Sequence, residues 1–206
     1  MKKGNLKLVV MIVLVVFAFI TCSERDSSSG EVDVQKALEN LNRAIMENPT
    51  AEAYLNRGEF YFQSAEYEKA IQDCNKAIKL KPSYKDAYIK IAISYKRMGQ
   101  YDKAIEEMTQ VIRISPDAGT YMSRANIYEE MNLCDKAIED YSKAVTLQPD
   151  NAQFYSYRGM TYNRCMKQYD KAIQDFNKAV TIKPDYSEAY YERGLFMRFQ
   201  GKSKRL

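Results

Sequence analysis

The residue types of this 206-residue chain limit the kinds of catalysis that it could perform. There is no histidine, which excludes a histidine general base, a Ser-His-Asp triad and a zinc site with histidine ligands. Adjacent acids, such as Glu106 with Glu107 and Glu129 with Glu130, lie in helical patterns and are interpreted as solvated surface charge. No glycine-rich phosphate loop and no cluster of metal ligands is present in the sequence. We therefore expect a protein that is not an enzyme and that uses no cofactor or metal.

The cysteines carry the remaining reactive chemistry. Cys74 falls within an apolar helical pattern, so we expect a buried thiol. Cys134 and Cys165 are predicted at helix turns on the same edge of neighbouring helix pairs, where an oxidising compartment would allow a disulfide. Equivalent points on packed helices lie about 9–10 Å apart, which is too far for a disulfide without local adjustment. Free thiols therefore remain the alternative.

The elements that position these residues come from a unit that begins at Ala51 and occurs four times. With Ala51 as position 1, Tyr stands at positions 4 and 11, Gly or Ala at 8, Ala at 20, a larger residue at 24, and Ala or Val at 27. Positions 4, 8 and 11 share one helical face, as do 20, 24 and 27 on a second helix. The fourth repeat carries one extra residue around 165–168, and when this residue is left out of the numbering all five prolines stand at position 32, where they end the second helix. A period in the thirties predicts stacked helix pairs.

This pattern resembles the tetratricopeptide repeat (TPR) family. It departs from the family pattern at six positions: Arg57, Arg124 and Arg158, where leucine is usual, Cys74 and Met108, where an aromatic is usual, and Val111, where alanine is usual. The resemblance implies an all-α fold, a right-handed α-solenoid of antiparallel helix pairs (the TPR superhelix). It also implies a concave groove lined by the first helix of each pair.

The pattern predicts the following organisation: a signal peptide at 1–21, a Ser-rich linker at 22–30, an N-terminal capping half-repeat at 31–50, full repeats at 51–84, 85–117, 118–151 and 152–186, and a C-terminal capping helix (a partial fifth repeat) at 187–206. A truncated chain is the alternative for the last segment, which is expected to turn at Gly201. Turns within repeats are expected at Gly99 and Asn132. The residues after the prolines are predicted helix N-caps: Thr50, Ser83, Asp117, Asp150 and Asp185.

The first residues have the layout of a secretory signal: Lys2, Lys3 and Lys7 precede thirteen apolar residues, 8–20. Such a helix spans about 20 Å, less than the ~30 Å hydrocarbon core of a bilayer. The segment is similar to bacterial lipoprotein signals, which implies lipidation of Cys22 and a membrane-anchored place in the cell envelope, on the periplasmic or surface face. Because Phe19 and Thr21 replace the usual residues, ordinary secretion and an uncleaved anchor stay open.

Charge gives no sign of a nucleic-acid partner. Three of the 31 basic residues lie in the first 22, so the rest of the chain has 28 basic against 27 acidic residues. A nucleic-acid-binding face is expected to be strongly basic. We therefore predict no nucleic-acid partner and no small-molecule substrate.

A stripe at positions 2, 5, 9 and 12 of each first helix adjoins the packing face, and the resemblance places it in the groove. The centre of this stripe is apolar and its flanks are polar, which favours binding of another protein. Packing between neighbouring repeats is the alternative explanation for each apolar member. The predicted groove residues are Leu55, Glu59, Phe62, Ile89, Ile93, Lys96, Met122, Asn126, Glu129, Ser156, Met160, Asn163, Tyr191 and Leu195.

The sequence thus predicts an interaction scaffold of the bacterial cell envelope that binds a segment of a partner protein in the groove of its repeat array. One alternative is a pilotin-like lipoprotein that assembles an outer-membrane or pilus complex. A second is a cytosolic TPR adaptor held by an uncleaved membrane anchor.

Overall fold

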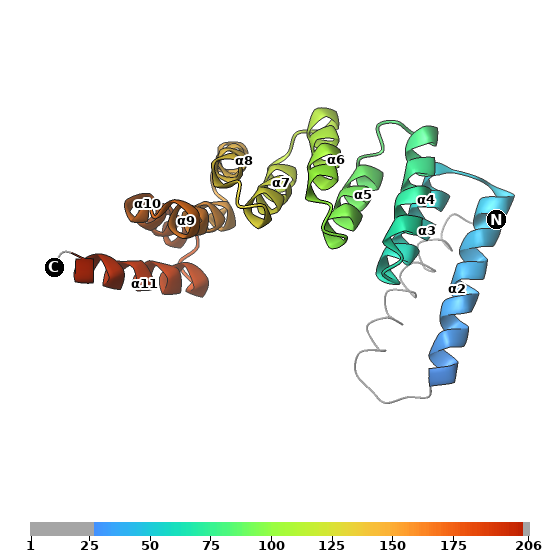
Figure 1. Cartoon of the computed structure of the whole chain (residues 1–206), viewed down its shortest axis with the longest axis horizontal. Coiled ribbons are helices and arrows are strands. Elements are labelled where there is room, and N and C mark those ends of the chain that lie inside the picture. The colour runs from blue at the N-terminus through green and yellow to red at the C-terminus, as the bar shows by residue number, and fades with distance from the viewer. Residues whose placement is uncertain (1–26, 204–206) are drawn as a thin grey trace. The chain divides into compact units, whose positions relative to one another are not determined.

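The computed structural model of the chain describes the backbone of residues 27–203 and the side chains of residues 34–195. Within these residues every regular element is an α-helix, which confirms the predicted all-α fold class. The helices are α2 (Ser27–Glu47), α3 (Ala51–Gln63), α4 (Tyr67–Leu80), α5 (Lys85–Arg97), α6 (Tyr101–Ile114), α7 (Ala118–Glu130), α8 (Cys134–Leu147), α9 (Ala152–Met166), α10 (Tyr169–Ile182) and α11 (Ser187–Ser203) (Figure 1). The predicted signal peptide and Cys22 lie outside the described residues.

The chain forms two compact units, one ending at Ser94 and the other beginning at Tyr95, so the boundary falls within α5. In the first unit α3 packs against both α2 and α4. In the second unit each helix from α6 to α11 packs against the next one. The pairs α3–α4, α7–α8 and α9–α10 make the most extensive contacts, as expected for the two helices of one repeat.

The predicted packing positions form the core. Cys74, Tyr141 and Phe176, all at position 24, are fully buried, and the alanines at positions 20 and 27 are buried with them. Glycine at position 8 allows the paired helices to approach closely: a Cβ atom placed on Gly159 would lie only 3.1 Å from Phe176 Cε1. The repeat pattern therefore specifies both the helices and the faces that they bury.

Proline sets the end of each second helix. Helices α2, α4, α6, α8 and α10 all end two residues before a proline, because the residue that precedes proline is disfavoured in the α conformation. The predicted caps hold for two first helices: Thr50 accepts a hydrogen bond from Ala53 N at 3.1 Å, and Asp117 accepts one from Thr120 N at 2.9 Å.

The other three predicted caps are wrong. Helix α9 is capped by Asn151 and not by Asp150, and the Asn151 side chain accepts from Gln153 N at 3.1 Å. One extra residue separates the proline from the helix here. The same extra residue precedes α5 and α11, so Ser83 and Asp185 lie too far before the first helical turn to cap it.

Both ends of the array are more helical than predicted. Helix α2 begins at Ser27, within the segment predicted as a Ser-rich linker, and α11 continues through the turn expected at Gly201. Extending an existing helix fixes one residue for each hydrogen bond gained, so serine and glycine are tolerated at a cost of about 1 kcal/mol or less.

Every turn inside a full repeat uses a left-handed residue with φ between 56° and 72°: Ala65, Gly99 and Asn132 at position 15, and Lys167 in the fourth repeat, which has one extra residue here. The expected roles of Gly99 and Asn132 are confirmed, while the sequence gives no signal for Ala65 and Lys167. An L-residue pays a steric penalty of about 1–2 kcal/mol in this region, whereas glycine adopts it freely.

Replacing Ala65 with glycine should therefore raise the free energy of unfolding by about 0.5–1 kcal/mol, after the larger backbone entropy of glycine in the unfolded chain is subtracted. Gly99→Ala is the matched control and should lower the free energy of unfolding by a similar amount. Urea unfolding followed by circular dichroism measures both changes. A destabilised Ala65→Gly variant would contradict the assigned turn geometry.

Candidate functional site

In the first unit, the predicted stripe is organised around a lysine that the sequence analysis did not select. The Lys90 ammonium group, from α5, forms an ion pair with Glu59 of α3 and lies 4.4 Å from the centre of the Phe62 ring. Gln63 Nε2 donates to Glu59 Oε1 at 3.1 Å. Lys90 thus links two of the predicted groove residues. The sequence signal for this ion pair is a lysine at position 6 of one first helix combined with an acid at position 9 of the preceding first helix.

The apolar members of the stripe in this unit are half-buried: Leu55, Ile89 and Ile93. They leave part of their apolar surface open beside the Glu59–Lys90 pair. Such a surface can bind an apolar side chain of a partner, and the neighbouring charges can orient it.

In the second unit, the stripe contains a partly buried hydrogen-bond cluster. The Tyr141 hydroxyl, from α8, contacts Asn126 Oδ1 and donates to Glu129 Oε2 at 2.8 Å. The Thr161 hydroxyl, from α9, lies 2.7 Å from Glu129 Oε1. The Glu129 carboxylate therefore joins α7 to α8 and α9, and this role could not be read from repeat position 12 alone.

The electrostatics of this cluster keep Tyr141 neutral. Burial raises the pKa of Tyr141 far above its usual value, and the Glu129 carboxylate raises it further. The Tyr157 ring stacks on Tyr141 with centroids 6.1 Å apart. A neutral phenol held in this way acts as a fixed hydrogen-bond donor and not as an acid or base.

The structure leaves most of the other predicted residues of this unit half-buried: Lys96, Met122, Met160, Asn163 and Leu195. Met122 and Met160 also pack against buried core residues, as the packing alternative expected. The Lys96 ammonium group lies 2.7 Å from Glu130 Oε1. Among the predicted groove residues named above, Tyr191 is the exposed one, at 66%.

The prediction for Ser156 is wrong. Ser156 is 0% exposed, and Tyr186, just before α11, lies beside its hydroxyl. Ser156 is therefore part of the interior and does not line an open groove.

The arginines that replace leucine at position 7 form a recurring ion pair that the sequence analysis missed. Each arginine binds the aspartate at position 23 of the same repeat in a bidentate arrangement, with N–O distances of 2.5–2.8 Å. The pairs are Arg57 with Asp73, Arg124 with Asp140, and Arg158 with Asp175. Each arginine also donates to a side chain at position 25 of the preceding second helix: Asn42, Thr109 or Ser142. This arrangement joins three helices through one guanidinium group.

The second repeat is the exception, since it has Ile91 at position 7 and Glu107 at position 23. Burial raises the pKa of Glu107, and the neighbouring Glu106 carboxylate adds to the effect. The joint presence of arginine at 7 and aspartate at 23 in the other three repeats is the sequence signal that predicts the ion pair.

Glu107→Gln should therefore stabilise the protein at neutral pH. The folded state raises the pKa of Glu107, so the folded protein binds its proton more tightly and loses stability as pH rises through that pKa. The gain from Glu107→Gln should be greatest at pH 7 and should disappear below the ordinary glutamate pKa of about 4.3. Thermal unfolding at both pH values measures it, and an equal gain at both would exclude the titration.

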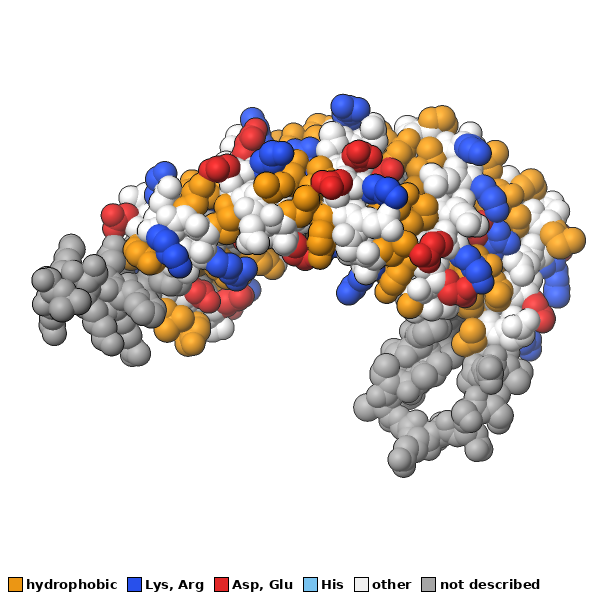
Figure 2. Space-filling view, in the orientation of Figure 1, with side chains coloured by type: hydrophobic (Ala, Val, Ile, Leu, Met, Phe, Trp, Pro, Cys, Tyr) orange, Lys and Arg blue, Asp and Glu red, His pale blue; other side chains and the backbone are white. Residues whose placement is uncertain are grey.

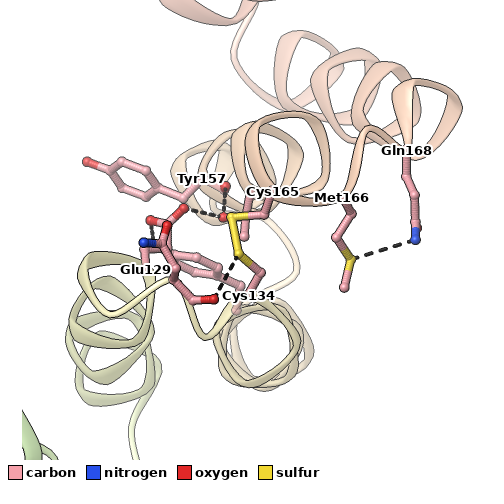
Figure 3. The surroundings of a disulfide bond; sticks show 9 residues. Glu129, Cys134, Tyr157, Cys165, Met166 and Gln168 are labelled. Atoms are coloured by element: carbon pink, nitrogen blue, oxygen red, sulfur yellow. Dashed lines mark hydrogen bonds between the residues drawn. A yellow bond between two sulfur atoms is a disulfide. The ribbon is translucent and has the colours of Figure 1, made fainter.

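The disulfide lies at the edge of the Glu129 cluster. Cys134, the first residue of α8, and Cys165, near the end of α9, are joined with Cα atoms 6.0 Å apart (Figure 3). This separation is shorter than the 9–10 Å expected for packed helices, since α9 extends to Met166 and carries Cys165 toward α8. Cys74 is a free, buried thiol, and burial raises its pKa to about 12.

A depression of about 1030 Å³ adjoins one end of the predicted stripe, since Gln153 and Glu188, both at position 2 of a first helix, line it. It is formed by the connections before α9 and before α11, and its walls include Leu147, Asn151, Ile182 and Tyr186. None of the predicted groove residues lines it.

On the face drawn in Figure 2, acidic and basic side chains are interspersed and no large area has one sign. Among the described residues, no group of three or more acidic, cysteine or histidine side chains is placed to hold a metal ion. No helix within residues 27–203 combines the length and the apolar character needed to cross a membrane.

Comparison with known proteins identifies the repeats. The tetratricopeptide repeat family matches residues 51–84 and 85–117, and the TPR repeat family matches 125–164 and 166–198. A small glutamine-rich tetratricopeptide repeat-containing protein of Dictyostelium discoideum is 36% identical over 70 residues, which are 34% of this chain and 21% of that protein. A protein SGT1 homolog of Oryza sativa subsp. japonica is 39% identical over 59 residues, 28% of this chain and 16% of that protein. The chain thus matches about a fifth or less of the length of these curated relatives.

Solved structures share the fold at low sequence identity. The crystal structure of MamA has a TM-score of 0.67 and 22% identity, and the match covers 81% of this chain and 99% of that one. YrrB, described as a TPR protein with an unusual peptide-binding site, has a TM-score of 0.63 and 20% identity over 80% of this chain and 85% of that one. The C-terminal part of a TPR repeat-containing protein from Cytophaga hutchinsonii has a TM-score of 0.73 and 18% identity over 83% and 68% of the two chains.

TPR repeats are generally scaffolds for protein–protein interaction and not enzymes. The repeat pattern, the buried positions 8, 20, 24 and 27, and the family matches agree across residues 51–198. The chain belongs to the tetratricopeptide repeat family.

Proposed function

We propose that this protein is a scaffold of the bacterial cell envelope that binds a segment of another protein on the first-helix face of its repeats. The observation that carries the proposal is the set of half-buried apolar side chains at equivalent places in successive first helices, such as Leu55 and Ile89 in one unit and Met122 and Met160 in the other. Exposed apolar surface aligned in this way is typical of a binding site.

The neighbouring polar groups support a peptide partner. Asn126 and Glu129 are held in place by Tyr141, and Glu59 is held by Lys90, so these side chains lose little rotamer entropy when a ligand arrives. Fixed amide and carboxylate groups beside an apolar strip suit a polypeptide that offers backbone N–H donors and apolar anchors. YrrB, whose description names a peptide-binding site, shares this fold.

Introducing a glutamate on this face should weaken partner binding strongly without unfolding the protein. We expect Ile93→Glu in the first unit, or Leu195→Glu in the second, to weaken binding of the co-purifying partner about a hundredfold, because a buried unpaired charge costs roughly 3 kcal/mol. Quantitative pull-down from detergent-extracted membranes measures the change, and circular dichroism checks the fold.

Gln72→Glu and Gln174→Glu are matched controls, because both glutamines are exposed on second helices and each change adds the same charge. They should bind like the wild type. Equal loss in the control and test variants, or no loss in the test variants, would exclude the first-helix face.

We further propose that the protein is a lipoprotein anchored through Cys22. The disulfide supports an oxidising compartment outside the cytosol over the cytosolic adaptor, since the cytosol keeps thiols reduced. Intact mass spectrometry of the membrane fraction tests this. A chain that begins at Cys22 and carries acyl groups is expected, and an unmodified chain that begins at Met1 would rule lipidation out.

A further inference from the structure

Glu129 places a fixed negative charge on the proposed partner-binding face of the second unit. It stands at position 12 of α7 and is half-buried. Tyr141 donates to Glu129 Oε2 at 2.8 Å, and the Thr161 hydroxyl lies 2.7 Å from Oε1. One oxygen is thus held from α8 and the other from α9. The two hydroxyls fix the carboxylate, and each oxygen keeps a second lone pair for another donor.

No cation within the described part of the chain forms an ion pair with this carboxylate. The next residue, Glu130, is paired with Lys96 at 2.7 Å. Arg164 of α9 opposes the rise in the pKa of Tyr141, but it makes no ion pair with Glu129. Glu129 also lies in the last turn of α7, which contains no basic residue and where the helix end carries partial negative charge. A cation beside Glu129 would therefore be attracted by both the carboxylate and the helix end.

The first unit has a cation at the equivalent place. Lys90, at position 6 of α5, pairs with Glu59 and lies 4.4 Å from the centre of the Phe62 ring, at position 12 of α3. An ammonium group at position 6 therefore reaches positions 9 and 12 of the preceding first helix. In the second unit Tyr157 stands at position 6 of α9, and its ring stacks on Tyr141. The second unit thus has the acid without the lysine.

Partly open apolar surface adjoins the Glu129 carboxylate. Met122, at position 5 of α7, and Tyr157 both pack against Tyr141, and both are half-buried. Gln153 Nε2 donates to the Tyr157 hydroxyl at 3.2 Å, which holds that ring from the first turn of α9. The methylene groups of an arginine or lysine side chain can cover such a surface while the charged end reaches the carboxylate.

We propose that Glu129 is a subsite that selects a basic side chain of the bound segment, so that the partner provides the cation that Lys90 provides in the first unit. This inference rests on the proposed function, because it specifies the partner of the same face: a protein segment with an arginine or lysine next to an apolar anchor. Charge-assisted hydrogen bonds to a carboxylate are roughly twice as strong as neutral ones, and arginine can make two at once. The subsite would give specificity to a face whose other contacts are mainly apolar.

Selection from a phage-displayed library of random peptides, against the whole chain purified in detergent, provides the probe. Peptides that bind the wild type should share an arginine or lysine beside an apolar residue, and selection against Glu129→Gln should lose this preference. Glutamine can still bond both hydroxyls, through its oxygen and its amide nitrogen, but it carries no charge. Glu139→Gln is the matched control, because it removes the same charge from an exposed site on α8, and it should select basic peptides as the wild type does.

The strongest selected peptide, and a copy whose basic residue is replaced by glutamine, give the size of the effect. Fluorescence anisotropy should show that the neutral copy binds the wild type about tenfold more weakly or worse, as expected for the loss of a hydrogen bond between charged groups. Glu129→Gln should bind the two peptides equally, and Glu139→Gln should retain the difference.

Tyr157→Lys tests the subsite while Glu129 is kept. It places a lysine at position 6, as in the first unit, so the ammonium group should pair with Glu129 inside the chain and remove the preference for basic peptides. This variant, together with the comparison of the two peptides on the wild type, keeps the test decisive if Glu129→Gln folds poorly. Circular dichroism checks the fold of each variant.

The outcomes separate this inference from the proposed function. If no peptide binds the wild type, the proposed function fails and the inference fails with it. If peptides bind without a shared basic residue, or if the basic preference persists in both Glu129→Gln and Tyr157→Lys, the face binds protein segments but Glu129 is not the subsite. Loss of the preference in Glu139→Gln as well would assign it to overall charge and overturn the inference.

Discussion

Arg124→Leu should lower the free energy of unfolding by about 3–5 kcal/mol, the largest loss that we expect from a single substitution in this chain. Asp140 is 3% exposed and accepts from Arg124 at 2.7 and 2.8 Å, so removal of the guanidinium leaves a buried carboxylate without its counter-ion. Thr109 also loses its hydrogen bond from Arg124, at 2.9 Å. Chemical unfolding followed by circular dichroism measures the loss.

The double variant Arg124→Leu with Asp140→Leu is the matched control. It removes both charges and should recover most of the stability, because apolar residues often replace a buried ion pair at little cost. The second repeat, in which Ile91 at position 7 is 1% exposed, is a precedent within this chain for an apolar residue at that place. If the double variant is as unstable as the single one, the loss in free energy of unfolding comes from packing and not from the unpaired Asp140 carboxylate.

Removal of the disulfide should have the second-largest effect. Cys134 and Cys165 are 31 residues apart in sequence, and closing a loop of this length restricts the unfolded chain by about 3–4 kcal/mol. Cys134→Ser with Cys165→Ser should lower the free energy of unfolding by that amount. The disulfide also borders the Glu129 cluster, so the serine variant should exchange the amides at the end of α9 faster.

Reductant gives the control for this prediction. It should destabilise the wild type by the same amount and leave the double serine variant unchanged, because Cys74 is a free thiol in both proteins. A wild type whose unfolding midpoint is insensitive to reductant would show that the bridge adds no stability.

The ion pair and the disulfide differ in how well each can be predicted from the sequence. The arginine and aspartate of each ion pair are 16 or 17 residues apart, so the pair could have been found by comparing Arg57, Arg124 and Arg158 with the residues at position 23. The disulfide could be suggested from the sequence but not predicted, because its formation depends on where α9 ends. The end of a helix is uncertain by one or two residues when it is inferred from sequence.

The sequence by itself determined the helices, their pairing and their buried faces. A repeat that cannot bury its apolar face alone must stack on its neighbours, and proline at position 32 and small residues at 8 and 20 leave few other ways to do so. Tertiary structure decided which polar groups meet: Lys90 between Glu59 and Phe62, Tyr141 between Asn126 and Glu129, and the burial of Ser156 beside Tyr186. The Lys90 contacts join two repeats, and the Tyr141 contacts join the two helices of one repeat. The geometry of all these contacts depends on how neighbouring helices are rotated, a quantity that repeat spacing does not contain.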